Sequence, residues 1–288
     1  MNSIHEAHIS CLPQIDIIGS PITALPFERQ ISEISNWSQR ALSKVVCVAN
    51  AHMLVESFND QELCSILKSA DLVTPDGMPL VWMMRVLGIR TQERVAGLDL
   101  FLALCQAAAD YGVSIFLVGS TQSVLDKMVQ KLAEDFPELR IAGAESPPFR
   151  PLTSAEDAGL VDRINSSGAG ITFVAFGCPK QEKWMGHHRD AVQSVMIGVG
   201  GVFPVYAGLK RRAPKWVCDN GLEWLYRLMQ EPRRLYRRYL RTNPQFIALA
   251  FAQIGQQYFL AKDIQERSGF SRLVSLIQAC WEGRKSAQ

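Results

Sequence analysis

The chain has 288 residues, of which 48% are hydrophobic and 20% are charged, and this composition is typical of a globular protein with one large or two small domains. No stretch of about 18 apolar residues occurs, so no membrane-spanning helix is expected. The N-terminal residues lack the apolar core of a signal peptide, so none is expected there. The seven cysteines are scattered singly, which favours reduced thiols in a cytoplasmic protein.

The net charge of +2 hides a strong asymmetry along the chain. Residues 209–241 contain ten Lys and Arg but only three Asp and Glu, a net charge of +7. The body that precedes them is acidic. A basic segment on an acidic body predicts an anionic partner for that segment.

Strand patterns alternate with helical patterns up to about residue 208, and the later residues are helical only. Alternation of this kind predicts an α/β fold, a Rossmann-like parallel sheet core over residues 1–208, with a C-terminal helical appendage over 209–288. Pro214, Pro232 and Pro244 each suit the first turn of a new helix. The expected strands are 13–19, 45–48, 71–73, 114–118, 171–176 and 195–201, and the clearest expected helices are 26–41, 78–87 and 99–111.

Polar or glycine-rich turns follow several of these strands. In open parallel sheets, ligands bind beyond the carboxyl ends of the strands, and the helix that follows each turn can bind phosphate oxygens with its free N–H groups. These turns contain Asn50, residues 74–77, residues 119–121 with Gly119, and residues 177–182 with Gly177. They fit a nucleotide diphosphate, although any nucleotide-binding protein would show the same pattern.

Asp76 is the sharpest candidate for chemistry, because a carboxylate in a turn beyond a strand can act as a general base. A simple turn-forming aspartate is the alternative. Arg94 can pair with a phosphate or with Asp99, or it can be an ordinary surface arginine.

The loop at 177–182 offers three further candidates for binding. Gln181 can hydrogen-bond sugar hydroxyls and Lys180 can meet a phosphate. Alternatively, these residues form a solvated helix start, where Glu182 is favoured by the helix dipole.

Two other classes of site are not supported by the sequence. The glycines at 198–201 lack the Gly-x-Gly-x-x-Gly spacing and the later acidic residue of a dinucleotide site. There is no Asp-x-Asp pair for Mg²⁺ or Mn²⁺, and the histidines lack metal-ligand spacing, so we expect no metal and no cofactor.

Taken in order, the motifs resemble those of the WecG/TagA/CpsF glycosyltransferases over about residues 14–255. They are Asn50-Ala-His, Pro75-Asp-Gly-Met, Arg94-Val-x-Gly-x-Asp99, Gly177-x-Pro-Lys-Gln-Glu182, Gly198-Val-Gly-Gly, Lys210-Arg-Arg-Ala-Pro214, Gly221-Leu-Glu-Trp-Leu-Tyr-Arg227 and Glu231-Pro-Arg-Arg234.

The resemblance implies an inverting, metal-independent transferase that uses a UDP-sugar. The donor sugar would be N-acetylmannosamine, its uronic acid, or a sugar of the glucose type, and the acceptor would be a polyprenyl-diphosphate-linked sugar in cell-surface polysaccharide synthesis. By the same resemblance Asp76 is the base, and Asn50, Arg94 and Gln181 bind the donor. Many members have Thr and Asp where this chain has Val48 and Pro204, and both differences concern donor-sugar specificity.

The resemblance also assigns three C-terminal arginines, Arg227, Arg234 and Arg237, to the active site. The last two are three residues apart and are therefore expected on one helix face. An apolar stripe with helical spacing follows, comprising Phe246, Ile247, Ala250, Phe251 and Ile254 and then Tyr258 and Phe259.

A basic segment beside such a helix predicts a peripheral position on an anionic membrane surface at the inner face of the cell membrane. Packing of the stripe on the α/β body is the alternative. We expect no nucleic-acid partner, and the sequence leaves the oligomeric state open, a homo-oligomer included.

Two other functions compete with this interpretation. A nucleotide-sugar-modifying enzyme, such as an epimerase or oxidoreductase, would need the dinucleotide fingerprint that the chain lacks. A non-catalytic assembly protein could keep the fold, but it would not need Asp76 or the arginines.

Overall fold

The computed structural model describes the backbone of residues 12–285 and the side chains of residues 12–258. The expected absence of a signal peptide therefore concerns residues that lie mostly outside the described part, and so does the side chain of Phe259. Five cysteines lie in the described part, and all five are free. By packing, residues up to Phe246 form one compact unit and residues from Ile247 onward form a second.

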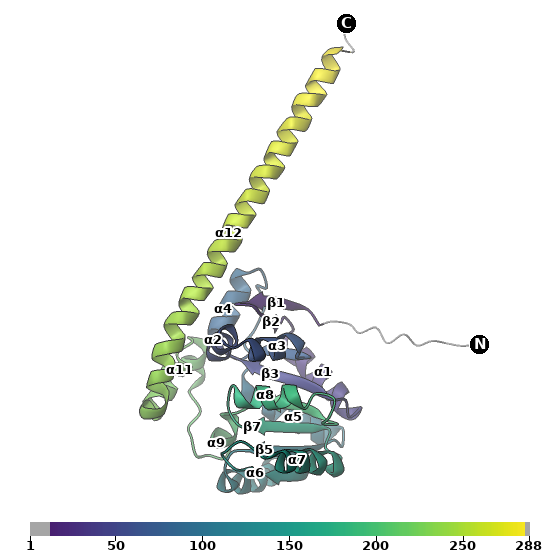
Figure 1. Ribbon diagram of the computed structural model, residues 1–288, viewed down its shortest axis with the longest axis vertical. Helices are drawn as coiled ribbons and strands as arrows, with labels where there is room; N and C mark the ends of the chain where they lie inside the picture. The colour runs from purple at the N-terminus through teal and green to yellow at the C-terminus, as the bar shows by residue number, and fades with distance from the viewer. Residues whose placement is uncertain (1–11, 286–288) are drawn as a thin grey trace, which may run out of the picture. The chain divides into compact units, whose positions relative to one another are not determined.

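In the described part of the chain, a parallel sheet of six strands forms the centre of the first unit (Figure 1). Its strand order is β4-β3-β8-β7-β5-β6, and every neighbouring pair is parallel. The expected fold class, a Rossmann-like α/β core, is thereby confirmed. The strands are β3 (Lys44–Ala49), β4 (Leu72–Pro75), β5 (Ser114–Gly119), β6 (Arg140–Glu145), β7 (Ile171–Ala175) and β8 (Val195–Gly198).

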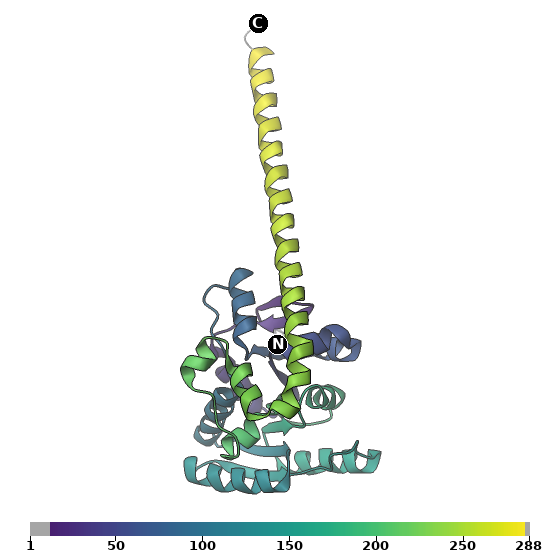
Figure 2. The ribbon, with the colours of Figure 1, turned by 90° about the vertical axis from the view of Figure 1, so that its left-hand side faces the viewer.

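Helices cover both faces of this sheet (Figures 1 and 2). On one face, Ile34, Leu104, Leu125 and Phe203 share a buried core with alternate strand residues. α2, α3 and α8 pack together on the other face. The strands are thus apolar on both faces, as unbroken apolar runs predict. The helices of the sheet region are α1 (Phe27–Gln39), α2 (Ala51–Asn59), α3 (Gln61–Ser69), α4 (Met78–Val86), α5 (Gly97–Asp110), α6 (Gln122–Asp135), α7 (Ser154–Ser167), α8 (Lys180–His187) and α9 (Val202–Tyr206).

Three further helices follow the sheet. They are α10 (Lys215–Asp219), α11 (Glu223–Gln230) and α12 (Pro232–Lys285). Pro214 and Pro232 begin helices as expected, but the expectation for Pro244 was wrong, because it lies inside α12. The N–H that Pro244 lacks would have bonded the carbonyl of Leu240, a residue that is exposed, so water can take its place there.

Two strands were not expected from the sequence. The strand expected over residues 13–19 is a hairpin of β1 (Gln14–Ile17) and β2 (Ser20–Thr23), which turns at Ile18 and Gly19 with positive φ. β6 is an edge strand whose residues are at most half-buried, and it therefore lacks an apolar run. Among the described residues, no helix has the length and apolarity needed to cross a bilayer.

Candidate active site

A cleft of about 300 Å³ lies at the carboxyl ends of the strands in the first unit. The helices that follow β3 and β8, α2 and α9, lie on opposite faces of the sheet, and such a divergence opens a crevice between strand ends. The cleft runs from Asp76 beyond β4 to Ser120 beyond β5, and residues of α10, α11 and α12 also line it.

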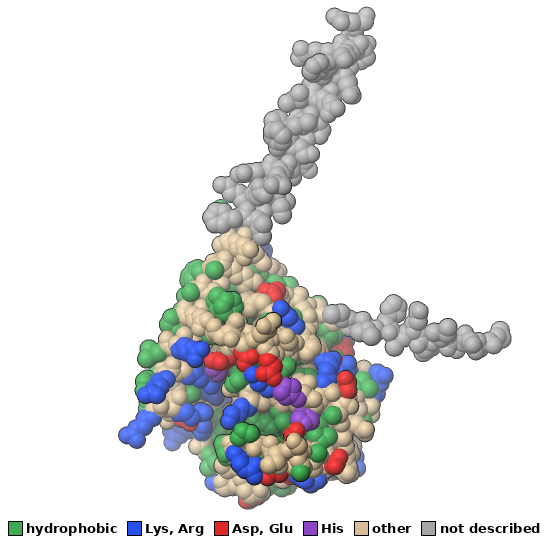
Figure 3. All heavy atoms as spheres, in the orientation of Figure 1, with side chains coloured by type: hydrophobic (Ala, Val, Ile, Leu, Met, Phe, Trp, Pro, Cys, Tyr) green, Lys and Arg blue, Asp and Glu red, His purple; other side chains and the backbone are tan. Residues whose placement is uncertain are grey.

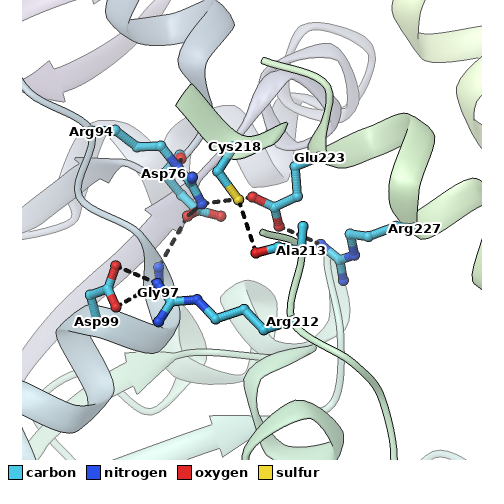
Figure 4. A network of polar contacts seen from close by, with 9 residues as sticks. All are labelled: Asp76, Arg94, Gly97, Asp99, Arg212, Ala213, Cys218, Glu223 and Arg227. Carbon is cyan, nitrogen blue, oxygen red and sulfur yellow. Dashed lines mark hydrogen bonds and ion pairs between the residues drawn. The ribbon is translucent and has the colours of Figure 1, made fainter. Parts of the chain in front are cut away.

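Asp76 lies at the β4 end of the cleft, where the backbone holds it firmly. Its N–H donates to the carbonyl of Ala49 at 2.8 Å, and its Oδ1 accepts from the N–H of Gly97 at 3.0 Å (Figure 4). Its side chain keeps 20% of its surface exposed and lines the cleft. Burial and the neighbouring carboxylate of Glu223 raise the pKa of Asp76, although Arg94, the Gly97 N–H and Arg227 oppose the rise.

Arg94 connects Asp76 to the C-terminal helices. Its Nη2 lies 2.6 Å from Oε2 of Glu223 and 3.6 Å from Oδ1 of Asp76, and its Nε donates to the backbone carbonyl of Asp76. Burial lowers the pKa of Arg94, but the carboxylates of Asp76 and Glu223 outweigh it, so the pKa is raised and the guanidinium stays charged. The pairing of Arg94 with Asp99 that the sequence allowed is wrong, because Asp99 pairs with Arg212 at 2.6 Å.

Asn50 caps α2 at the adjacent strand end. Its Oδ1 accepts from the N–H of Met53 at 3.2 Å, and the residue lines the cleft. Since the oxygen serves the cap, the amide NH₂ is the group of Asn50 with donors left for a ligand.

The loop after β7 is braced by Gln181. Its Oε1 accepts from the N–H of Gly177 at 3.1 Å, and its Nε2 donates to Oε1 of Glu182 at 2.7 Å. A Cβ at Gly198 would lie 2.9 Å from that Nε2, so the glycine lets the amide pack against β8. Gln181 lines the cleft, but its amide is engaged within the protein, and this geometry makes it a brace of the loop.

Glu182 lies behind the cleft and does not line it. It is fully buried, its Oε2 has no hydrogen-bond partner in the described part of the chain, and burial raises its pKa to about 7. Lys180, also predicted to bind substrate, is exposed and outside the cleft lining.

Three arginines of the C-terminal helices line the cleft: Arg227, Arg234 and Arg238. Arg227 lies so close to the loop after β8 that a Cβ at Gly201 would be 2.6 Å from its Nη2. Arg238 is half-buried, and its Nε lacks a partner among the described residues. Burial lowers the pKa of Arg238, and so do Arg227 and Arg234, so the three guanidinium groups lie close enough to repel one another.

Arg237 lies outside the cleft lining, where its Nε donates to the hydroxyl of Tyr236 at 2.7 Å. Asp99 and Gly119 also lie outside the lining, although Ser120 beside Gly119 belongs to it. Gly119 has a φ of +102°, and a Cβ there would lie 2.9 Å from the backbone of Ala175, so its role in the loop is conformational.

Sequence reasoning missed several residues of the cleft, among them Glu223 and Arg238. Glu223 lies within the motif that carries Arg227, and Arg238 directly follows Arg237. The sequence therefore contained the right segments, but it did not show which of their side chains face the cleft. Val48 and Pro204, where this chain departs from the family pattern, both line the cleft. Among the described side chains, no group of three or more His, Cys, Asp or Glu could hold a metal ion.

Comparison with known proteins agrees with the motifs. The sequence model of the glycosyl transferase WecG/TagA/CpsF family matches residues 15–259. An N-acetylglucosaminyldiphosphoundecaprenol N-acetyl-beta-D-mannosaminyltransferase of Bacillus subtilis (strain 168) is 32% identical over 204 residues, which cover 70% of this chain and 77% of the relative. A protein of the same name from Bacillus spizizenii is 29% identical over 235 residues, which cover 81% of this chain and 87% of the relative.

Glu182→Gln should remove a pH dependence from the stability of the fold. The pKa of this carboxyl rises from 4.5 to about 7 on folding, so the folded state keeps its proton to a higher pH than the unfolded state. The free energy of unfolding therefore falls as the pH rises between these values. Chemical unfolding at several pH values should show the variant gaining on the wild type by up to about 3 kcal/mol above pH 7. The exposed Glu138→Gln serves as the control, and an equal difference at all pH values would contradict the assignment.

Proposed function

Because the chain belongs to the WecG/TagA/CpsF family of glycosyltransferases, we propose that it transfers a sugar from a UDP-sugar to a polyprenyl-diphosphate-linked acceptor. The matched Bacillus proteins, named as N-acetylmannosaminyltransferases that act on N-acetylglucosaminyldiphosphoundecaprenol, make N-acetylmannosamine the first donor sugar to test. The observation that carries the proposal is a cleft with the partly buried carboxylate of Asp76 at one end and Arg227, Arg234 and Arg238 of the C-terminal helices along its wall.

The acceptor hydroxyl is placed at Asp76 in this proposal. The raised pKa of Asp76 makes its carboxylate a stronger base than an ordinary aspartate. Asp76 takes the proton as the hydroxyl oxygen attacks the anomeric carbon, and the bond from that carbon to the UDP oxygen breaks on the opposite side. The configuration at the carbon is therefore inverted.

The departing diphosphate needs positive charge in place of a metal ion. Arg227, Arg234 and Arg238 line the same cleft and can donate charge-assisted hydrogen bonds to its oxygens. The proposed reaction is therefore independent of metal ions.

Release of UDP and formation of a glycosylated lipid test the function. With UDP-N-acetylmannosamine and a prenyl-diphosphate-linked N-acetylglucosamine, we expect both in the presence of EDTA. Asp76→Asn keeps the shape but cannot take a proton, so transfer should fall roughly 10²–10⁴-fold while UDP still binds.

Transfer by this variant within a few-fold of the wild type would show that Asp76 is not the base. Loss of wild-type transfer in EDTA and its return with Mg²⁺ would overturn metal independence. Binding of the UDP-sugar without product from any donor in a panel would favour a non-catalytic protein.

Arg238 lines the cleft, whereas the family resemblance assigns its neighbour Arg237 to the active site, so a comparison of the two tests which one binds the diphosphate. Arg238→Ala should weaken UDP binding at least about tenfold, since it removes a charged hydrogen-bond donor from the cleft wall. Arg237→Ala is the matched variant and should weaken UDP binding less, because its guanidinium lies on Tyr236 outside the lining. Calorimetric titration with UDP compares them, and the reverse order would place Arg237 at the diphosphate.

Arg237 was predicted to take part in the reaction, and we propose that it does so on the side of the lipid-linked acceptor. It belongs to a basic and apolar surface on the helices at the end of the first unit, which we define by the eight residues given below. Figure 3 shows Lys and Arg side chains gathered over α11 and the start of α12. The surface comprises Trp216, Leu225, Met229, Arg233, Tyr236, Arg237, Leu240 and Arg241.

This surface suits an anionic membrane. Met229 and Leu240 are 67% and 72% exposed, and none of the residues of α11 is buried. Arginines attract anionic headgroups while apolar side chains enter the interface. Of the apolar stripe expected further on, Phe246 is buried, whereas Ile247 and Phe251 are exposed.

Met229→Gln with Leu240→Gln should reduce binding to phosphatidylglycerol vesicles about tenfold or more, because less apolar area can enter the interface. Tyr111→Gln replaces a residue that is also well exposed, at the end of α5 and away from this surface, and should bind like the wild type. Vesicle sedimentation at low ionic strength gives the comparison. Equal binding by both variants would remove this surface from membrane docking.

A further inference from the structure

Glu223 is the first residue of α11, and its carboxylate reaches into the site. Its Oε2 lies 2.6 Å from Nη2 of Arg94, and its Oε1 lies 3.9 Å from Nη1 of Arg227 (Figure 4). Glu223 thus joins an arginine of the sheet region to an arginine of the C-terminal helices. The reaction proposed above gives this carboxylate no role.

The distances around Arg94 show which carboxylate holds its guanidinium. Nη2 is at hydrogen-bond distance from Glu223, at 2.6 Å, but at 3.6 Å from Oδ1 of Asp76. A guanidinium bound directly to the base would hold it in its charged, unreactive form. The ion pair with Glu223 therefore takes up the donor that could otherwise bind Asp76.

We propose that Glu223 is a positioning residue that holds Arg94 off the carboxylate of Asp76, so that Asp76 can take a proton only while α11 is seated against the sheet. The proposal rests on the proposed function, because Asp76 is the base only in that reaction. It adds that the helices carrying the membrane-facing surface control the base itself.

The charges that face Asp76 come from three elements. Arg94 lies on the loop before α5, the Gly97 N–H is at the start of α5, and Glu223 and Arg227 come from α11. Cys218 of α10 also contacts Arg94 and Glu223. Of the groups facing Asp76, Glu223 carries the negative charge, and its removal leaves two arginines acting on the base.

Displacement of α11 would change the site in one direction. Arg94 would lose Glu223 but keep its bond to the backbone carbonyl of Asp76, so it would remain beside that residue. Its Nη2 would then be free to close on Oδ1 of Asp76. The base would become weaker, and premature use of the donor away from the acceptor would slow.

Glu223→Gln tests the proposal in the full-length protein. The amide keeps the size of the side chain but loses the charge, so the pKa of Asp76 should fall. We expect the acid limb of the kcat profile to move down by about one pH unit. We also expect kcat to fall about tenfold with little change in KM for the UDP-sugar.

Glu223→Asp and Asp219→Asn are the companion variants. Glu223→Asp keeps the charge on a shorter side chain, so it should keep the wild-type acid limb and recover part of the rate. Asp219→Asn makes the same charge change on an exposed residue of the same basic segment and should behave as the wild type. A wild-type kcat and pH profile for Glu223→Gln would overturn the proposal.

A titration without substrates separates this proposal from the proposed function. The side-chain carboxyl of Asp76 can be followed by ¹³C NMR in protein labelled at aspartate, with Asp76→Asn identifying its signal. Its midpoint should fall by about one pH unit in Glu223→Gln and stay unchanged in Asp219→Asn. An unchanged midpoint in Glu223→Gln overturns the coupling even if transfer is found, and a shifted midpoint supports it even if the transferred sugar proves different.

Discussion

The geometry of the cleft depends on one guanidinium shared between two carboxylates. Arg94 is held by Glu223 from the C-terminal helices and lies beside Asp76 at the end of β4. Taking Asp76 out of water costs free energy in its charged form, and Arg94 with the Gly97 N–H offsets part of that cost. Because Glu223 opposes them, the carboxylate is neither fully neutralised nor left without a partner. The base proposed at Asp76 needs this intermediate state in order to take a proton.

The same sheet edge contains a second carboxyl, that of Glu182, which is fully buried. Glu182 has no arginine in hydrogen-bond contact among the described residues, and burial raises its pKa to about 7. It receives the amide of Gln181, which in turn holds the N–H of Gly177. Burying Glu182 costs stability, and the same contacts hold the loop after β7 in place.

The sequence predicts the sheet core well because its signal is local. Unbroken apolar runs such as residues 115–118 are typical of buried strands in a sheet covered on both faces. The candidate Asp76 was found because it lies just beyond such a strand. The edge strand β6 lacks this signal, since one side of an edge is half exposed. The loop positions that need glycine, such as Gly119, are likewise visible in the sequence, although the contacts that require them are not.

The C-terminal half of the cleft could not be derived in the same way. Neighbouring residues on a helix point about 100° apart, so the choice between Arg237 and Arg238 depends on how α12 is rotated against the sheet. The spacing of three between Arg234 and Arg237 favoured one face, but the helix presents Arg234 and Arg238, four residues apart, to the cleft. Rotation is set by long-range packing, here by the burial of Leu235, Thr242 and Phe246.

This packing also explains how a segment with a charge of +7 stays on the body. Of its three acids, Glu223 holds Arg94, and Glu231 holds Lys210 at 2.8 Å and Arg234 at 2.5 Å. Both therefore act as internal anchors, and neither lies on the surface defined by Met229 and Leu240. The remaining arginines keep an excess of positive charge that can attract anions from outside the protein.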